Sequence, residues 1–297
     1  AGIAAAVVLL SILLSRMLTR KISTLLTAIR KVRAGAYEHR THISGRDEIA
    51  QIGEEFNSLT DRLQTTETLR RRFVSDASHE LKTPLAAIRL LTDSILQTDQ
   101  MDMETVRDFV TDIGSEAERL SRITEDLLRL TRLDSDLLDA PETVEVAPVL
   151  EQVMRMMSLL AQEKGTELTY RMEGNCRVSA TKGEVHQVIY NLTDNAVKYS
   201  GKNGKVRVEL RHEDHDVVLT VADNGPGIPE EDLPKVFERF YRVDKARSRA
   251  AGGTGLGLSI VQDTVKKRGG TVSAANRAGG GAVFTVRWPE AEGGDRS

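Results

Sequence analysis

The chain contains 297 residues, of which 40% are hydrophobic and 29% charged, and its formal net charge is -3. This length predicts two or more folded domains, and the nearly balanced charge argues against a general attraction to nucleic acid. The single cysteine, Cys176, excludes an intrachain disulfide and a thiolate metal cluster, which fits a reducing cytoplasm.

Residues 1–14 form an uncharged, largely apolar run that is shorter than the roughly 20 residues of a membrane-spanning helix. Basic residues follow at once, beginning with Arg16, Arg20 and Lys21, as is typical of the cytoplasmic flank of a membrane helix. We therefore interpret residues 1–15 as the C-terminal end of a transmembrane helix in the cytoplasmic (inner) membrane, with the rest of the chain in the cytoplasm. A buried helix or a signal-peptide core is the alternative.

Two apolar patterns with helical spacing follow, at residues 17–33 and 49–63, on either side of the polar connector AGAYEHRTHISGR. Two short amphipathic helices after a membrane segment, together with the sequence RDEIAQIGEEFNSL, resemble the HAMP linker family. We assign residues 16–65 to such a linker. A generic coiled coil is the alternative.

Residues 66–138 contain two longer helical patterns separated by QTDQMDM. Each carries an apolar stripe, which includes Leu81 and Leu85 in the first pattern and Ile123 and Leu130 in the second. One hairpin alone cannot bury both stripes, whereas two hairpins packed as a four-helix bundle can. We therefore expect this segment to form a homodimer.

Beyond Pro141 the pattern changes to short alternating strands interspersed with helices. The expected strands are ELTYRM, KVRVELR, VVLTVAD, TVSAA and AVFTVRW, with helices near residues 149–164, 183–199 and 257–268. We predict an α/β sandwich over residues 139–297 with its helices on one sheet face. The expected fold is thus multidomain, with all-α membrane-proximal segments and a dimeric four-helix bundle preceding this sandwich.

The first long helix contains a histidine beside an acid, in the stretch SDASHELKTPL. His79 lies roughly 200° around the helix from its apolar stripe, so its side chain is expected to face water. Pro84 removes the donor that would reach the Glu80 carbonyl and is expected to bend the helix. A nucleophilic imidazole needs a carboxylate that orients the ring or accepts its proton, which Glu80 can provide. An ordinary surface histidine is the alternative.

Two segments of the C-terminal half offer groups suited to a nucleotide. Asn191 and Asn195 lie four residues apart on one helix face, where amide oxygens can hold a Mg²⁺ that keeps water and phosphate ligands. Asp223 ends a strand and precedes Gly225 and Gly227, so its carboxylate can accept a hydrogen bond from an exocyclic amine such as that of adenine. Two amides that tie a helix to a loop, and a simple turn, are the respective alternatives.

Two further segments offer groups suited to phosphate. The polar segment DLPKVFERFYRVDKARSRAAGG is typical of a loop that closes over a ligand, and its Arg242 can supply charge to a γ-phosphate. Gly253, Gly255 and Gly257 open a helix, where backbone donors and the helix dipole attract phosphate. The run lacks the Lys-Ser/Thr pair of a P-loop.

The order HELKTP, NLTDNAVKYS, DNGPGIP, FERFYRVD and GTGLGLSI resembles the H, N, G1, F and G2 boxes of the sensor histidine kinases of two-component signalling. The resemblance implies a Bergerat-type site for ATP and Mg²⁺. It also implies phosphorylation of His79 from ATP, followed by transfer to an aspartate on the receiver domain of a response regulator.

The resemblance assigns the remaining roles residue by residue. Glu80 is the adjacent acid, and Thr83 positions water for dephosphorylation of the partner, although Thr83 can also cap the turn before Pro84. Mg²⁺ contact is implied at Asn195 with help from Asn191. The implied nucleotide contacts are Lys198, Tyr199, Asp223 at the adenine, Gly225, Gly227, Arg242, Gly253, Gly255 and Gly257.

Approach of the ATP domain to the bundle requires a hinge, which we expect at residues 134–141. Two other functions stay open on the sequence. One is an ATPase of the wider GHKL superfamily that acts as a conformational clamp without histidine phosphorylation. The other is a catalytically silent scaffold.

Overall fold

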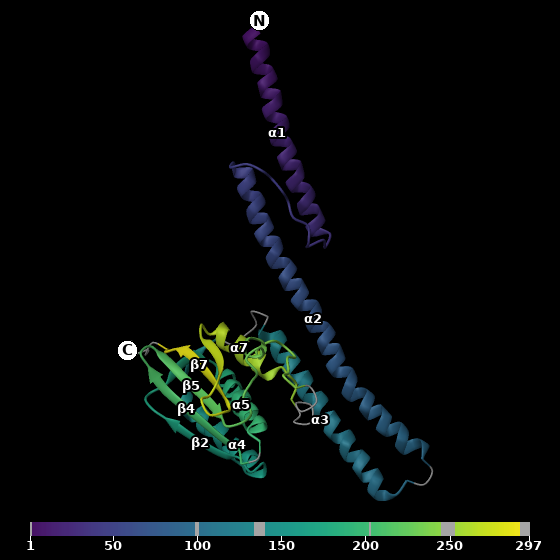
Figure 1. Ribbon diagram of the computed structural model, residues 1–297, viewed down its shortest axis with the longest axis vertical. Coiled ribbons are helices and arrows are strands. Elements are labelled where there is room, and N and C mark those ends of the chain that lie inside the picture. Colours follow the sequence, from purple (N-terminus) through teal and green to yellow (C-terminus); the bar gives the residue numbers. More distant parts are fainter. Residues whose placement is uncertain (1, 99–100, 134–139, 202, 245–252, 292–297) are drawn as a thin grey trace. The chain divides into compact units, whose positions relative to one another are not determined.

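The computed structural model describes residues 2–98, 101–133, 140–201, 203–244 and 253–291. These residues belong to two compact units, Ala1–Asp76 and Ala77–Ser297, with the elements labelled in Figure 1. Residues 134–139 of the expected hinge and residues 245–252 of the expected covering loop lie outside the described part of the chain.

The first unit begins with one continuous helix, α1 (Gly2–Arg33). It joins the apolar run to the basic amphipathic segment because no glycine or proline interrupts residues 3–33. By length and composition α1 is able to cross a membrane. The boundary expected near residue 15 is therefore not a break in the helix.

The connector after α1 is fastened to the next helix, α2 (Glu48–Gln97), by a reciprocal amide pair. The Thr41 backbone N–H donates to Asn57 Oδ1, and Asn57 Nδ2 donates to the Thr41 carbonyl, both at 2.9 Å. Ala28 and Val32 on α1 are buried, as expected for the apolar face of an amphipathic helix that packs on a neighbour.

The second linker helix and the first hairpin helix are a single element, since α2 extends over 50 residues. The segment between them, QTTETLRRR, contains good helix formers, and Glu67 pairs with Arg70 and Arg71 at 2.9 Å. The helix also continues through Pro84 without a break.

The second hairpin helix is α3 (Met103–Leu133), which runs opposite to the end of α2 (Figure 1). Asp102 starts it, because its carboxylate accepts hydrogen bonds from the Thr105 N–H and hydroxyl, both at 2.8 Å. Ile123 and Leu130 are fully buried as expected, but Leu85 is 59% exposed. A single hairpin therefore does not bury the whole of the predicted stripe.

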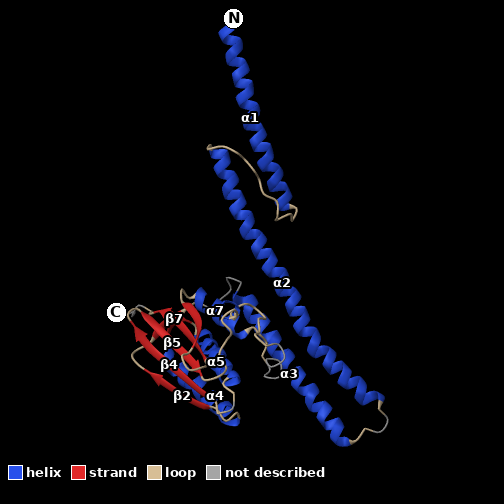
Figure 2. Cartoon of the chain, viewed as in Figure 1, coloured by secondary structure: helices blue, strands red, loops and turns tan. Residues whose placement is uncertain are grey.

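The α/β domain consists of a five-stranded sheet in the order β2-β4-β5-β7-β6, with helices on one face (Figure 2). The strands are β2 (Glu167–Met172), β4 (Lys205–Glu213), β5 (Asp216–Asp223), β6 (Thr271–Asn276) and β7 (Ala282–Pro289). The helices are α4 (Val146–Glu163), α5 (Lys182–Tyr199) and α7 (Gly257–Lys267), with a 3-10 turn, η1, at Leu233–Lys235. These elements match the predicted strands and helices.

The alternation of β4 explains why only one face is covered. Val206, Val208 and Leu210 are buried, whereas Lys205 and Arg207, which alternate with them, are exposed. β2 pairs with β4 in parallel, and the other pairings of this sheet are antiparallel. The side chains that point to the helices therefore form the core, and the opposite face remains polar.

A small antiparallel sheet of β1 (Glu142–Glu145) and β3 (Arg177–Ala180) was not expected from the sequence. Each strand has only four residues, which is too short for a clear alternating pattern. A further backbone hydrogen bond extends this pairing, because the Val146 N–H donates to the Cys176 carbonyl at 2.9 Å.

Candidate functional site

Helices α5 and α7 form the frame of the candidate site. Thr181 and Glu184 make a capping box at the start of α5, with hydrogen bonds of 3.2 and 2.8 Å. The Glu184 carboxylate also binds the Arg268 guanidinium, which follows α7, at 2.8 and 2.9 Å. This largely buried pair fixes the end of α7 beside the beginning of α5.

The two predicted amides of α5 have different surroundings. Asn191 is buried, and its Nδ2 donates to the Gly257 carbonyl at 3.1 Å while its Oδ1 accepts from Gln187 at 2.9 Å. It therefore ties α5 to the start of α7. Asn195, one turn later, is half-buried, and its side chain forms no hydrogen bond or ion pair with the described residues. Its amide oxygen is the better placed of the two for a cation.

The end of α5 contributes the next predicted contacts. Lys198 Nζ binds Asp194 Oδ2 at 2.6 Å, and both side chains are largely buried. The Tyr199 carbonyl lies so close to Gly225 that a Cβ atom on Gly225 would clash with it. The turn after β5 thus depends on glycine to approach the last turn of α5.

Asp223 ends β5 with its carboxylate buried. Its Oδ1 accepts the backbone N–H groups of Gly225 at 2.8 Å and Ala282 at 3.2 Å. Burial raises the pKa of Asp223, although the two backbone hydrogen bonds oppose that shift. Since both bonds go to one oxygen, the other oxygen is available to accept from a ligand amine.

The F and G2 segments lie against each other. Phe240 has a φ of 62° and Gly255 a φ of 74°, and the Phe240 N–H donates to the Gly255 carbonyl at 2.8 Å. A Cβ on Gly255 would come within 3.1 Å of Arg242 Nε. Phe237 anchors the segment by an edge-to-face contact with Phe284 of the core, with 6.3 Å between ring centroids.

The start of α7 has the features of an anion site. No side chain among the described residues caps this end, and Gly257 is the first helical residue. Its first-turn N–H groups are therefore available to phosphate oxygens, which the helix dipole also attracts. Gly253 lies half-buried just before this helix. Gly227 lies farther along the G1 segment, against Asn276 of β6, which accepts the Ile228 N–H at 2.8 Å.

The predicted phosphoacceptor is exposed on α2, and its neighbour is engaged with the α/β domain. His79 faces solvent, and the Thr83 hydroxyl donates to the His79 carbonyl at 3.2 Å. Glu80 Oε2 binds Arg242 Nη2 at 3.0 Å and Arg119 Nη2 at 3.2 Å. The arginine predicted to face phosphate thus contacts the acid beside His79.

Two functional candidates on α3 were missed in the sequence. Arg119 is buried beside Glu80, and Asp126 Oδ2 accepts the Thr254 hydroxyl at 2.8 Å. Both occur at helical spacing with the buried residues Ile123 and Leu130. A charged residue within an apolar stripe was the signal that could have identified them.

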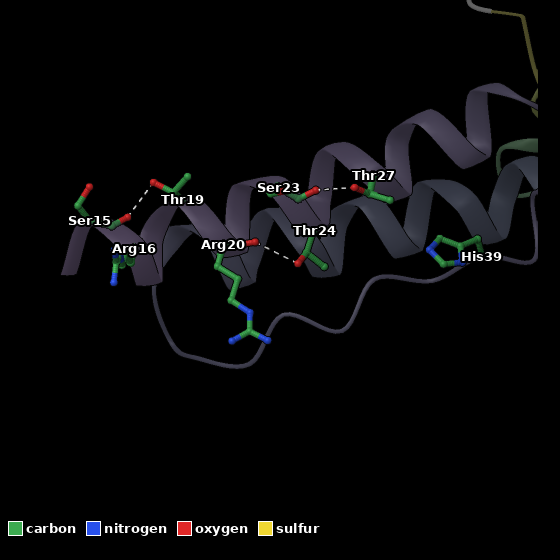
Figure 3. A pocket seen from close by; sticks show the side chains of 8 residues that line it. All are labelled: Ser15, Arg16, Thr19, Arg20, Ser23, Thr24, Thr27 and His39. Carbon is green, nitrogen blue, oxygen red and sulfur yellow. Dashed lines mark hydrogen bonds between the residues drawn. The ribbon is translucent and has the colours of Figure 1, made fainter. Parts of the chain in front are cut away.

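The hollow in Figure 3 is a poor alternative site. It is open and is lined by α1 and His39 in the first unit, and it contains none of the predicted site residues. Its threonine hydroxyls already bind their own helix, since Thr19, Thr24 and Thr27 donate to carbonyls four residues earlier at 2.8 to 3.0 Å.

Three domain families match the chain in the order expected from its motifs. The HAMP domain matches residues 13–65, and the His Kinase A (phospho-acceptor) domain matches residues 69–136. The histidine kinase-, DNA gyrase B-, and HSP90-like ATPase matches residues 180–292. In the content and order of its domains the chain matches the sensor histidine kinases. Its apolar α1 fits a membrane-anchored member of this family.

Individual relatives agree with this assignment. The signal transduction histidine-protein kinase BaeS of Escherichia coli (strain K12) is 31% identical over 95% of this chain and 60% of its own length. The chain spans between 57% and 62% of the length of the curated relatives that it matches.

Solved histidine kinases share the fold. The crystal structure of full-length ShkA in complex with AMPPNP is 29% identical, with a TM-score of 0.54 over 76% of this chain and 46% of that chain. ThkA in complex with the response regulator protein TrrA is 22% identical and agrees in fold, with a TM-score of 0.63 over 84% of this chain and 69% of that chain. Together with the site, the ATPase family match indicates ATP binding.

Proposed function

We propose that this chain is an ATP-dependent protein-histidine kinase that phosphorylates His79 and passes the phosphoryl group to an aspartate of a response regulator. The observation that carries the proposal is the ion pair of 3.0 Å between Glu80 and Arg242. It joins the segment of the phosphoacceptor to the F segment of the nucleotide domain. The proposed domain limits are residues 1–15, 16–65, 66–138 and 139–297.

The nucleotide contacts follow from the groups described above. Asp223 accepts the exocyclic amine of adenine through its second carboxylate oxygen. Lys198 and Tyr199 line the nucleotide from the end of α5, and Gly225 and Gly227 let it approach the backbone.

The phosphate contacts come from the F and G2 segments. Gly253, Gly255 and Gly257 expose N–H groups to the phosphates, and Arg242 faces the terminal phosphate. When bound, Mg²⁺ offsets charge on the phosphates, with Asn195 as its protein ligand and Asn191 in support.

The chemistry at α2 requires a neutral imidazole nitrogen on His79. Its exposed position allows in-line attack on a phosphorus brought up by the nucleotide domain. Glu80 orients the ring or accepts the proton released in the attack. Thr83 positions the water that removes the phosphoryl group from the partner, which gives the chain a phosphatase activity as well.

The partners follow from the family. ThkA has been solved in complex with the response regulator protein TrrA, and we propose a receiver domain of that kind as the phosphoryl acceptor here. We also propose a homodimer through the α2–α3 hairpin, because the hairpin leaves Leu85 exposed. The anchor at residues 1–15 places the remainder of the chain on the cytoplasmic side of the membrane.

Incubation of the full chain with γ-labelled ATP and Mg²⁺ tests the proposal. We expect an acid-labile, base-stable label on the protein that is lost in His79→Gln. The exposed His212→Gln, which bears the same change in the α/β domain, serves as the matched control and retains the label. Asn195→Ala should abolish labelling while the dimer persists.

Other outcomes would contradict the proposal in different ways. Phosphate release without a protein-bound label would favour a conformational ATPase. Neither label nor nucleotide binding would favour a scaffold. Loss of the dimer in Asn195→Ala would show that Asn195 acts in folding rather than at the cation.

A further inference from the structure

The second hairpin helix presents a closely packed face to the α/β domain. Ile123 and Leu130 of α3 are fully buried, and α3 packs against α7. Asp126 lies between these two residues on the same face, at helical spacing. A carboxylate within an apolar contact loses solvation, so its partners have to compensate for that loss.

The partner of Asp126 belongs to the proposed phosphate-binding loop. Thr254 Oγ1 donates to Asp126 Oδ2 at 2.8 Å and accepts the Leu256 N–H at 3.3 Å. At the opposite end of α7, Lys267 Nζ donates to the Leu133 carbonyl at 2.8 Å. Polar contacts therefore hold α7 to α3 both before its first residue and at its last.

Asp126 also places a carboxylate at the loop where phosphates are expected. Burial raises the pKa of Asp126, and the hydrogen bond from Thr254 and the charges of Arg129 and Lys198 oppose that shift. An ionised carboxylate that contacts this loop repels a triphosphate, because like charges interact strongly in a poorly solvated environment.

A second contact ties the same two parts of the chain together. Glu80 binds Arg242 at 3.0 Å, so a second predicted phosphate-facing group is held by a hairpin carboxylate. Arg119 of α3 also binds Glu80, at 3.2 Å. The hairpin thus occupies two separate groups of the nucleotide site.

We propose that Asp126 is a positioning residue that holds the phosphate-binding loop on α3 through Thr254, and that nucleotide binding competes with this contact. The inference rests on the proposed nucleotide site. The Asp126–Thr254 contact and the bound nucleotide favour different conformations of the same loop. Each therefore weakens the other, and a tighter hold of Asp126 on the loop means weaker nucleotide binding. Release of Thr254 accompanies binding and frees the domain to approach His79.

Calorimetric titration of the full chain in lipid nanodiscs with AMPPNP and Mg²⁺ tests this competition. Asp126→Asn keeps the size of the side chain and an acceptor for Thr254 but removes the charge, so we expect the Kd for AMPPNP to fall about fivefold. Asp126→Ala removes the contact altogether and should lower the Kd at least as much. A purely structural role predicts an unchanged or higher Kd.

Glu125→Gln is the matched control, because this neighbouring exposed acid loses the same charge without contacting Thr254. Its Kd should equal that of the unmodified chain. An equal fall in Glu125→Gln would mean a general charge effect and would overturn the proposal, as would an unchanged or higher Kd in Asp126→Asn.

A double-mutant cycle with Thr254→Val isolates the contact itself. Asp126→Asn should have a smaller effect on the Kd when Thr254 is already valine, because only the charge repulsion of the triphosphate then remains, and an undiminished fivefold fall would overturn the role of Thr254. Absence of AMPPNP binding by the unmodified chain would overturn the proposed function together with this inference. Tight binding by the unmodified chain with no difference in Asp126→Asn would overturn the inference alone.

Discussion

The α/β domain and the helical hairpin differ in how completely they bury their apolar side chains. In the domain, Leu219 has no exposed surface and Trp288 only 2%, and both belong to one continuous core. In the hairpin, Leu85 is 59% exposed and Leu90 67% exposed. The domain therefore buries its apolar residues in its own core, whereas the hairpin leaves apolar side chains exposed for contact with another surface.

This difference separates the two parts of the proposed reaction. The closed core keeps the nucleotide residues in fixed positions at the ends of α5, β5 and α7. The hairpin holds His79, the proposed phosphoacceptor, on an exposed helix face, where partners can reach it. Variants that affect only one of the two parts test the distinction.

The largest effect is expected from the core of the domain. Leu219→Ala should lower the free energy of unfolding by about 2–5 kcal/mol, since it removes a fully buried side chain. Leu159→Ala, at a site that is 69% exposed in the same domain, should change it by less than about 0.5 kcal/mol. Thermal unfolding followed by circular dichroism measures both, and equal losses would contradict a closed core.

The next effect concerns the nucleotide alone. In Asp223→Asn the amide oxygen can retain the hydrogen bonds from Gly225 and Ala282, but the amide N–H₂ then faces the adenine amine. Because the amide N–H₂ and the adenine amine are both hydrogen-bond donors, they cannot bind each other. The Kd for AMPPNP should therefore rise about 100-fold without unfolding of the domain. Calorimetry with a parallel thermal melt measures this, and unaltered binding would remove Asp223 from the adenine site.

A smaller effect is expected in the hairpin. Leu85→Gln should weaken the proposed dimer about tenfold, because Leu85 belongs to the predicted interface stripe. Leu90→Gln changes an equally exposed leucine outside that stripe and should leave the dimer unaffected. Sedimentation over a dilution series measures both dissociation constants, and equal values would place the interface elsewhere.

The smallest effect is a pH dependence of stability. The pKa of Asp223 is raised by burial, so this group favours the folded state when protonated and loses that contribution as pH rises through the folded pKa. Asp223→Asn should therefore melt a few degrees higher than the unmodified chain at pH 7, and the difference should close toward pH 4. A difference that widens on acidification would contradict the sign.

The sequence predicted the parts of the structure that depend on local pattern. The strands of the large sheet alternate clearly, and the helices of residues 146–163 and 182–199 follow their apolar spacing. Strands β1 and β3 were not predicted, because a strand of four residues is too short to show a clear alternation of apolar and polar residues. The continuity of α2 was not predicted from the sequence, because the two halves of this helix were assigned to different domains. The local helix propensity between them is high enough to keep the helix unbroken.

Individual residues of the candidate site were proposed from the sequence, but which of them contact one another was not predicted. Box residues identify chemistry, yet they do not reveal that Arg242 contacts Glu80 or that Thr254 contacts Asp126. Such pairs join residues more than a hundred positions apart, so they form only where the hairpin packs against the α/β domain. The exposure of Leu85 agrees with the sequence-based expectation, because the interior of a bundle needs more helices than one hairpin provides.

The most direct test of the account is to map the phosphorylated side chain after incubation with ATP and Mg²⁺. Peptide mass spectrometry at alkaline pH, where phosphoramidates survive, should locate the phosphoryl group on the imidazole of His79. A phosphoryl group found stably on a serine, threonine or aspartate of this chain instead, with His79 unmodified, would contradict the account.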